Sequence, residues 1–184
     1  MITTEFLSAN KFNDYSQWLK MQDYETRCLY FGVSANDCVI DSLMEKVLKS
    51  PDDHYILVAK EKEKWVGTVH IAVTGAQVEF GIIVHEEHRG QGIANIMLEQ
   101  AIVWARNRGY KELFMHCLTR NTAIRHLCEK HGLQTSNMLG DTEVKMRLSP
   151  PNMVTLAKEA AFKQRNVFHM WLQDTKTFYQ EIYG

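Results

Sequence analysis

Proline, glycine and long apolar runs are all scarce in this sequence of 184 residues. It contains 3 prolines and 10 glycines and no repeat or low-complexity stretch, which excludes collagen-like and disordered chains. No apolar run approaches the roughly 18 residues that a membrane-spanning helix needs. The first residues, from Met1 to Leu7, lack the basic and apolar regions of a signal peptide. We therefore expect a cytoplasmic protein that does not engage a membrane.

An excess of charge of one sign is also lacking, since 21 lysines and arginines face 22 aspartates and glutamates. A net charge of -1 gives no global attraction for nucleic acid, so we expect no nucleic-acid partner. The cysteines contain no Cys-x-x-Cys pair, which excludes a zinc knuckle and a thioredoxin-like redox motif. The 8 histidines contain no His-Glu-x-x-His motif. The sequence thus predicts a reduced protein without a metal site.

The body of the chain has the composition of one globular domain, with 45% hydrophobic and 23% charged residues. Apolar spacing predicts helices before residue 50, one of them capped by Asn36 or Asp37. Strands are expected at 54–59, 65–73, 77–84, 112–118 and 143–148, and helices at 93–109 and 121–130. This order predicts an α/β fold in which helices lie on the faces of a mixed sheet.

The C-terminal segment is expected to be separate from this body. A Ser-Pro-Pro motif at 149–151 marks a boundary, which gives a domain at 1–148 and an extension at 149–184. Apolar residues with helical spacing run from Met153 to Leu172, so the extension is predicted to be an extra helix that packs on the domain. A dimerisation arm and a lid over a substrate site are the alternatives, and the apolar stripe also allows a homodimer.

The strongest chemical feature is a glycine loop between a predicted strand and a predicted helix. It reads His-Arg-Gly-Gln-Gly-Ile-Ala over residues 88–94. Glycines bring backbone N–H groups close to a ligand, and the amides at a helix N-terminus attract a phosphate or pyrophosphate. The loop lacks the Gly-Lys-Ser/Thr of a Walker loop and the third glycine of a dinucleotide fingerprint. On glycine spacing alone, a plain strand-to-helix turn explains the loop equally well.

Two motifs together resemble the acetyl-coenzyme A site of the GNAT acyltransferase superfamily. The family's loop reads Gln/Arg-x-x-Gly-x-Gly/Ala, which is matched here by Arg89, Gly92 and Ala94. Residues 121–133 resemble the family's asparagine-containing helix that ends in Glu-Lys-x-Gly-Phe, here Glu-Lys-His-Gly-Leu. Their order, with a helix and a strand between them, makes the pair far more specific than either motif alone. The resemblance covers roughly residues 5–148.

The resemblance implies a GNAT-like fold with a central, mostly antiparallel sheet, and acetyl-CoA as the cosubstrate. The strand that enters the loop would pair with the pantetheine arm, and the loop amides would surround the pyrophosphate. The side chain of Asn121 would hydrogen-bond the pantetheine or the thioester end. The implied acetyl-CoA residues are Ile82, Ile83, Val84, Arg89, Gly90, Gln91, Gly92, Ile93, Ala94, Asn95 and Asn121.

Acetyl transfer to an amine needs a base, because an amine of pKa about 10.4 is mostly protonated at neutral pH. Glu79 is the first candidate, since some family members carry a catalytic glutamate on this strand; a half-exposed glutamate on a β face is the alternative. His116 is the second, where relatives that act on protein N-termini carry a glutamate; a structural histidine is the alternative. Cys128 occupies the place of the tyrosine that many relatives use to protonate the leaving thiolate. It is either the acid here or a small core residue.

The resemblance implies an N-acetyltransferase in which a primary amine attacks acetyl-CoA directly in a ternary complex. The acceptor stays open between a protein lysine or N-terminus, a polyamine and a small metabolite. The side chains that could line or charge an acceptor site are Tyr24, Tyr30, Phe31, Asp23, Glu25 and Asp37. A non-catalytic CoA-binding module, such as a sensor or an assembly subunit, is the alternative that Cys128 favours. Transfer of an acyl group other than acetyl is a third hypothesis.

Overall fold

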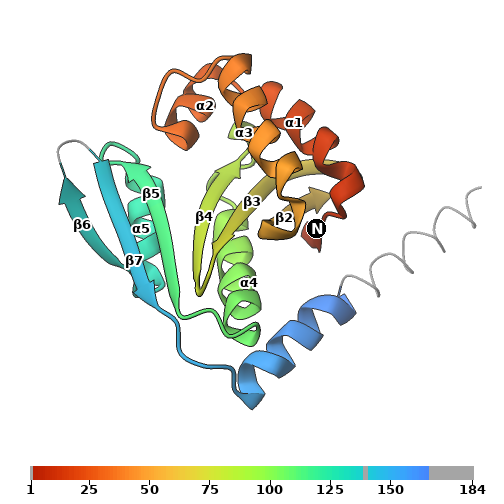
Figure 1. Ribbon diagram of the computed structural model, residues 1–184, viewed down its shortest axis with the longest axis vertical. Coiled ribbons are helices and arrows are strands. Elements are labelled where there is room, and N and C mark those ends of the chain that lie inside the picture. Colours follow the sequence, from red (N-terminus) through yellow and green to blue (C-terminus); the bar gives the residue numbers. More distant parts are fainter. Residues whose placement is uncertain (1, 139–140, 166–184) are drawn as a thin grey trace, which may run out of the picture.

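A single mixed sheet forms the centre of the molecule in the structure, a computed structural model that describes residues 2–138 and 141–165 (Figure 1). The strands are β1 Ile2–Phe6, β2 His54–Glu61, β3 Lys64–Thr74, β4 Gln77–Val84, β5 Glu112–Leu118, β6 Gln134–Met138 and β7 Asp141–Arg147. Within the described residues they form a sheet of seven strands in the order β1-β2-β3-β4-β5-β7-β6. Neighbours are antiparallel, except that β4 and β5 run parallel. The predicted α/β fold with a mostly antiparallel sheet is confirmed.

Helices cover both faces of this sheet (Figure 1). The α-helices are α1 Phe12–Lys20, α2 Tyr24–Phe31, α3 Asp37–Lys49, α4 Ile93–Asn107 and α5 Thr122–Lys130. Short 3-10 helices are η1 Ala9–Lys11, η2 Pro51–Asp53 and η3 Glu86–His88. A further helix begins at residue 153 and is described as far as residue 165. None of the described helices combines the length and the apolar character that crossing a membrane requires.

Strand β2 shows how the two helical layers are held. Its residues Ile56, Leu57, Val58 and Ala59 are all 0% exposed, although neighbours in a strand point to opposite faces. Ile56 and Val58 belong to the apolar cluster under α1 and α3, whereas Leu57 and Ala59 belong to the cluster under α4. A strand buried on both faces has a continuous apolar sequence, which is why this run was visible in the sequence.

Strands β4 and β5 separate after a short parallel pairing, and this separation positions the site. Their register joins 77–79 with 112–114, whereas β4 continues to Val84 and β5 to Leu118. In the described part of the chain, the two strands are not paired with each other beyond Glu79. Residues 80–84 therefore keep an open backbone edge on the β5 side, and such an edge can hydrogen-bond an extended ligand.

The structure contains two strands and one helix break that the sequence analysis missed. Strands β1 and β6 form the two edges of the sheet, and neither has an apolar run like those of the inner strands β2 and β3. The break between α1 and α2 occurs where Asp23 accepts a hydrogen bond from the N–H of Thr26 at 2.8 Å. Of the two predicted caps of α3, Asn36 is the one used, and its Oδ1 accepts from the N–H of Val39 at 3.3 Å.

The described part of the C-terminal extension contacts α4 through polar groups. Asn107 Nδ2 donates to Glu159 Oε2 at 2.6 Å, and Lys158 Nζ lies 2.7 Å from Glu99 Oε1. The apolar residues Met153 and Leu156 are 81% and 50% exposed, so they do not face the core. The rest of the predicted extension, at 166–184, lies outside the described residues.

Candidate functional site

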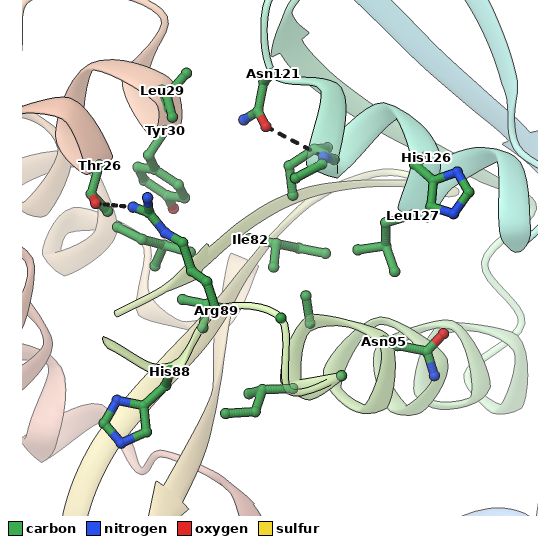
Figure 2. Close-up of a pocket in the computed structure, with 18 of the residues that line it drawn as sticks. Thr26, Leu29, Tyr30, Ile82, His88, Arg89, Asn95, Asn121, His126 and Leu127 are labelled. Carbon is green, nitrogen blue, oxygen red and sulfur yellow. Dashed lines mark hydrogen bonds between the residues drawn. The ribbon is translucent and has the colours of Figure 1, made fainter. Parts of the chain in front are cut away.

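A cavity of about 440 Å³ opens where β4 separates from β5, and α2, the glycine loop, α4 and α5 form its other walls (Figure 2). Gln91 is the predicted acetyl-CoA residue that does not line this cavity, and its side chain lies 3.4 Å from the carbonyl oxygen of Glu87. The predicted residues that do line it are Ile82, Ile83, Val84, Arg89, Gly90, Gly92, Ile93, Ala94, Asn95 and Asn121. Tertiary structure therefore brings the two sequence motifs to the same cavity.

The glycine loop presents bare backbone to the cavity. Gly90 and Gly92 have φ values of 74° and 76°, in the left-handed region that favours glycine. A Cβ atom at either residue would meet nothing within 4 Å, so this side of the loop is open. Gly92 is also the N-cap of α4 and contributes no side-chain cap. The first amides of α4 are thus left for an anionic ligand, as expected at a helix N-terminus.

Arg89 ties the glycine loop to α2 across the mouth of the cavity. Its Nη2 donates to Thr26 Oγ1 and lies 3.9 Å from Asp23 Oδ2 (Figure 2). Partial burial raises the pKa of Asp23, but the hydrogen bonds from Thr26 and the charge of Arg89 outweigh it, so the net shift is downward. The other predicted acid of this region, Asp37, pairs with Arg27 at 2.8 Å. These carboxylates hold α2 in place and do not line the cavity.

Tyr30 of α2 lines the cavity and lies over β4. Its hydroxyl is 3.0 Å from the hydroxyl of Tyr15, and its ring packs edge-on against Phe31 at 4.8 Å. A Cβ atom at Gly81 would lie 2.8 Å from Tyr30 Oη, so the close approach of α2 to β4 requires glycine there. Burial raises the pKa of Tyr30 to about 12, and the charge of Glu79 adds to the shift. The Tyr30 hydroxyl therefore stays protonated across the physiological range.

Helix α5 forms the wall opposite α2. Asn121 caps it, because its Oδ1 accepts from the N–H of Ile124 at 3.3 Å, and its Nδ2 lies on the side away from the helix (Figure 2). Residues of α5 that the sequence analysis did not assign also line the cavity, namely Ala123, Ile124, His126, Leu127 and Lys130. Ala123, His126, Leu127 and Lys130 have the helical spacing i, i+3, i+4 and i+7, which places them on one face, and this signal could have found them.

The candidate bases lie together, but outside this cavity. Glu79 and His116 line a smaller cavity of about 180 Å³, and both side chains are exposed. Glu79 is the last residue of β4 that pairs with β5, opposite Phe114. His116 follows two residues later on β5, so the two candidates flank the point where the strands part.

Cys128, the candidate acid, lies in the core. It is 0% exposed, does not line the cavity, and its Sγ is 3.9 Å from Met115 Sδ. Burial raises the pKa of Cys128 to about 12, and the neighbouring Cys117 and Glu129 add to the shift. The thiol occupies the position of the family's tyrosine without its access to the cavity.

A second cavity of about 670 Å³ adjoins the first along α2. The two share Leu29, Asn121 and Ala123. Of the residues predicted to line an acceptor site, Tyr24 and Glu25 line this second cavity. A molecule held there would approach the first cavity beside Asn121.

Comparisons with known proteins agree with this geometry. A model of the acetyltransferase (GNAT) family matches residues 13–133. The acetyltransferase of GNAT family from Streptococcus pneumoniae has a TM-score of 0.64 at 18% identity, covering 81% of this chain and 100% of its own. Spermidine N-acetyltransferase from Vibrio cholerae, solved with CoA and spermine, has a TM-score of 0.64 at 15% identity, and the match covers 80% of this chain and 95% of that one. The PaiA N-acetyltransferase from Thermoplasma acidophilum, solved with coenzyme A, has a TM-score of 0.63 at 14% identity, and the match covers 80% of this chain and 99% of that one. No curated protein matches the chain in sequence.

Proposed function

Because the chain belongs to the GNAT acetyltransferase family, whose model matches residues 13–133, we propose that it transfers the acetyl group of acetyl-CoA to a primary amine in a ternary complex. The observation that carries this proposal is the open edge of β4, which lies beside a glycine loop and a helix N-terminus in one cavity. An extended amide-bearing arm can pair with the open edge of β4, and a pyrophosphate can bind to the amides of the glycine loop and the helix N-terminus. Acetyl-CoA combines both groups.

The residues of the cavity fit acetyl-CoA in polarity as well as in shape. Gly90 and Gly92 leave the loop amides accessible, and Lys130 adds a cation at the edge of the same cavity. Ile124 and Leu127 provide apolar surface for the methylene groups of the pantetheine arm. When bound, acetyl-CoA supplies a thioester carbonyl carbon that a neutral amine can attack. The chain's own residues must hold this group and remove the amine's proton.

We propose that Glu79 or His116 accepts that proton, because both flank the point where β4 and β5 part. Deprotonating an amine of pKa about 10.4 at pH 7 costs roughly 4.6 kcal/mol, so a nearby base has a large effect. Neither side chain lines the acetyl-CoA cavity, and a water molecule would therefore have to relay the proton. The charge of Glu79 already acts on Tyr30, which does line the cavity.

The leaving thiolate is proposed to take its proton from water, and the burial of Cys128 supports this. The Cys128 thiol is 0% exposed and does not line the acetyl-CoA cavity, so it cannot reach the leaving thiolate, whereas solvent can. Protonation by water keeps the enzymatic function compatible with a cysteine at this position. The non-catalytic CoA-binding module, which the missing tyrosine suggested, is therefore not favoured.

The acceptor is proposed to be a primary amine that enters through the second cavity. Glu25 lines this cavity and would attract a cationic amine, although Arg120 lines it too and balances the charge. The cavity therefore does not select among a protein lysine or N-terminus, a polyamine and a small metabolite. Acetyl as the transferred group, a cytoplasmic location and a homodimer also stay predictions from the sequence.

Thermal unfolding with and without acetyl-CoA tests cofactor binding. A ligand at about 100 times its dissociation constant adds roughly 2.7 kcal/mol, which for a chain of this size corresponds to a rise in melting temperature of about 5–10 °C. Adenosine monophosphate is the control, since it lacks the pantetheine arm. No rise with acetyl-CoA, in a protein that unfolds cooperatively, would contradict the proposal.

A matched pair of glycine substitutions locates the binding. Gly92→Ala and Gly109→Ala each place a Cβ on a residue with φ of 76° or 79°, with nothing within 4 Å, so both carry similar backbone strain. Only Gly92 lines the cavity, and only Gly92→Ala should reduce the stabilisation by acetyl-CoA. Thiol release with a panel of amines then distinguishes an enzyme from a CoA-binding module. Stabilisation by acetyl-CoA without release for any amine would favour the module.

A further inference from the structure

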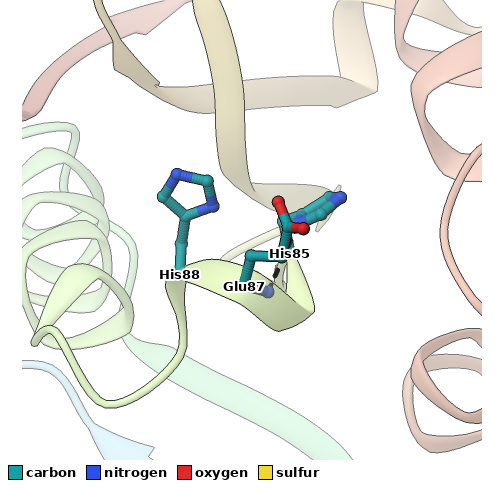
Figure 3. Close-up of side chains that lie close together, drawn as sticks. All are labelled: His85, Glu87 and His88. Atoms are coloured by element: carbon teal, nitrogen blue, oxygen red, sulfur yellow. Dashed lines mark hydrogen bonds between the residues drawn. The ribbon is translucent and has the colours of Figure 1, made fainter.

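Three side chains that can bind a metal lie together on the turn between β4 and the glycine loop. His85, Glu87 and His88 each offer one ligand atom, and these atoms all lie within 4.8 Å of one another. Figure 3 shows the three side chains gathered on one side of η3. The sequence predicted no metal site because the histidines lack the His-Glu-x-x-His spacing. His85 and His88 are three residues apart, and the 3-10 turn of η3 brings residues at this spacing onto one side.

We propose that His85, Glu87 and His88 bind one divalent transition-metal ion of the Zn²⁺ class. Two imidazoles and one carboxylate form a ligand set that zinc accepts, with water in the fourth position. Tetrahedral zinc at about 2.0–2.1 Å from each ligand atom separates the ligand atoms by about 3.3 Å. The three ligand atoms, which lie within 4.8 Å of one another, must therefore move only slightly closer together to bind one ion. Because Glu87 is exposed and the histidines are half-buried, such rotation is open to them.

The surroundings of His88 support a ligand role for its Nδ1. That nitrogen is buried and has no hydrogen-bond partner among the described residues. The other ring nitrogen, Nε2, lies 3.4 Å from Glu61 Oε2 on β2. A carboxylate behind an imidazole favours the tautomer with the proton on Nε2, which leaves the lone pair of Nδ1 for a metal. Carboxylate, histidine and metal would then stand in the order common at zinc sites.

The local bonds of the other two ligands do not oppose metal binding. The N–H of Glu87 donates to His85 Nδ1 at 3.4 Å, and this contact is long and exposed. When the His85 ring turns toward a metal, water can accept the hydrogen bond from the N–H of Glu87 in place of His85 Nδ1 at little cost. The two rings already lie close, with centroids 5.7 Å apart. A bound ion would link the turn to β2 through His88 and Glu61, just before the loop that contains Arg89.

Zinc binding by the full chain tests this proposal without acetyl-CoA, so its outcome is independent of the proposed enzymatic function. We would titrate the protein with Zn²⁺ alone against a chromophoric chelator that competes for the ion. The variants are His85→Ala and Glu87→Gln, whose side chains do not line the acetyl-CoA cavity. Glu86→Gln is the matched control, because it removes a second exposed carboxylate from the same turn but outside the cluster. Cys38→Ser controls for zinc captured by the exposed thiol.

The proposal expects one equivalent of Zn²⁺ per chain and at least about tenfold weaker binding in His85→Ala and in Glu87→Gln. Glu86→Gln and Cys38→Ser should bind zinc as the wild type does. The melting temperatures measured without metal should be close to that of the wild type, because Glu86, Glu87 and Cys38 are exposed and the contact that half-buried His85 loses is long. Absence of saturable binding in the wild type would overturn the proposal. Wild-type affinity in His85→Ala, with loss of binding in Cys38→Ser, would overturn it as well.

Discussion

Substitution of Gly81 by alanine tests the contact that sets α2 against β4. In most strands this change stabilises a protein by roughly 0.5–1 kcal/mol, because glycine loses more backbone entropy on folding. At Gly81 the new Cβ would lie 2.8 Å from Tyr30 Oη, 3.0 Å from Cε2 and 3.1 Å from Cζ. Contacts shorter than about 3.4 Å between these atoms force the ring to move. The structure therefore predicts that Gly81→Ala lowers the free energy of unfolding instead of raising it.

The magnitude follows from the two effects that oppose each other. An added methyl group in a tight site costs about 1–3 kcal/mol, and displacing Tyr30 also weakens its 3.0 Å hydrogen bond with Tyr15, a further loss of about 0.5–1.5 kcal/mol. Subtracting the entropic gain of roughly 0.5–1 kcal/mol leaves a net destabilisation of about 0.5–4 kcal/mol. Since Tyr30 lines the acetyl-CoA cavity, acetyl-CoA should also bind more weakly.

Urea unfolding of four proteins measures this contact directly. They are the wild type, Gly81→Ala, Tyr30→Phe and the double variant. Phenylalanine removes the atom nearest to the new methyl group and frees the ring from Tyr15, so Gly81→Ala should cost about 1 kcal/mol less in the Tyr30→Phe background. A stabilising Gly81→Ala, or equal costs in the two backgrounds, would refute the packing of α2 on β4 described above.

Three further predictions concern the proton donors and acceptors. If Glu79 or His116 is the base, Glu79→Gln or His116→Ala lowers kcat by at least about tenfold in a thiol-release assay, and both assignments fall if neither does. Cys128→Ala should keep kcat within about threefold, because the buried thiol pairs with Met115 and does not line the cavity; a larger loss would return Cys128 to the mechanism. Burial, with the neighbouring His54, lowers the pKa of His70 to about 4, whereas the unfolded value is about 6.5. The neutral ring therefore contributes stability fully above pH about 6.5, and up to about 3 kcal/mol is lost as pH falls toward 4. His70→Gln should flatten this dependence in urea unfolding at several pH values, and an unchanged slope would contradict it.

The parts of the fold that the sequence predicted are those with strong local signals. Strand β4 and strand β5 match their predicted bounds, and α5 begins one residue after its predicted start at Asn121, which caps it. Each has a run of apolar residues or a cap whose effect is confined to a few neighbours. The edge strands β1 and β6 were missed because an edge needs one partner and little burial. Strand β1 takes its place by pairing with β2, which lies much further along the chain, at His54–Glu61, and β6 takes its place by pairing with the next strand, β7.

The candidate site likewise has parts that local sequence predicts and parts that depend on tertiary contacts. By itself, the sequence determined the glycine loop and its helix N-terminus, because φ values near 75° at Gly90 and Gly92 and free first-turn amides are local properties of a few residues. Only the tertiary structure decided that β4 and β5 part after Glu79, that Cys128 lies in the core, and that His88 lies beside Glu61. Each of these depends on contacts between segments far apart in the chain, and side-chain burial and charge at such contacts exist only after the sheet and its helices have packed.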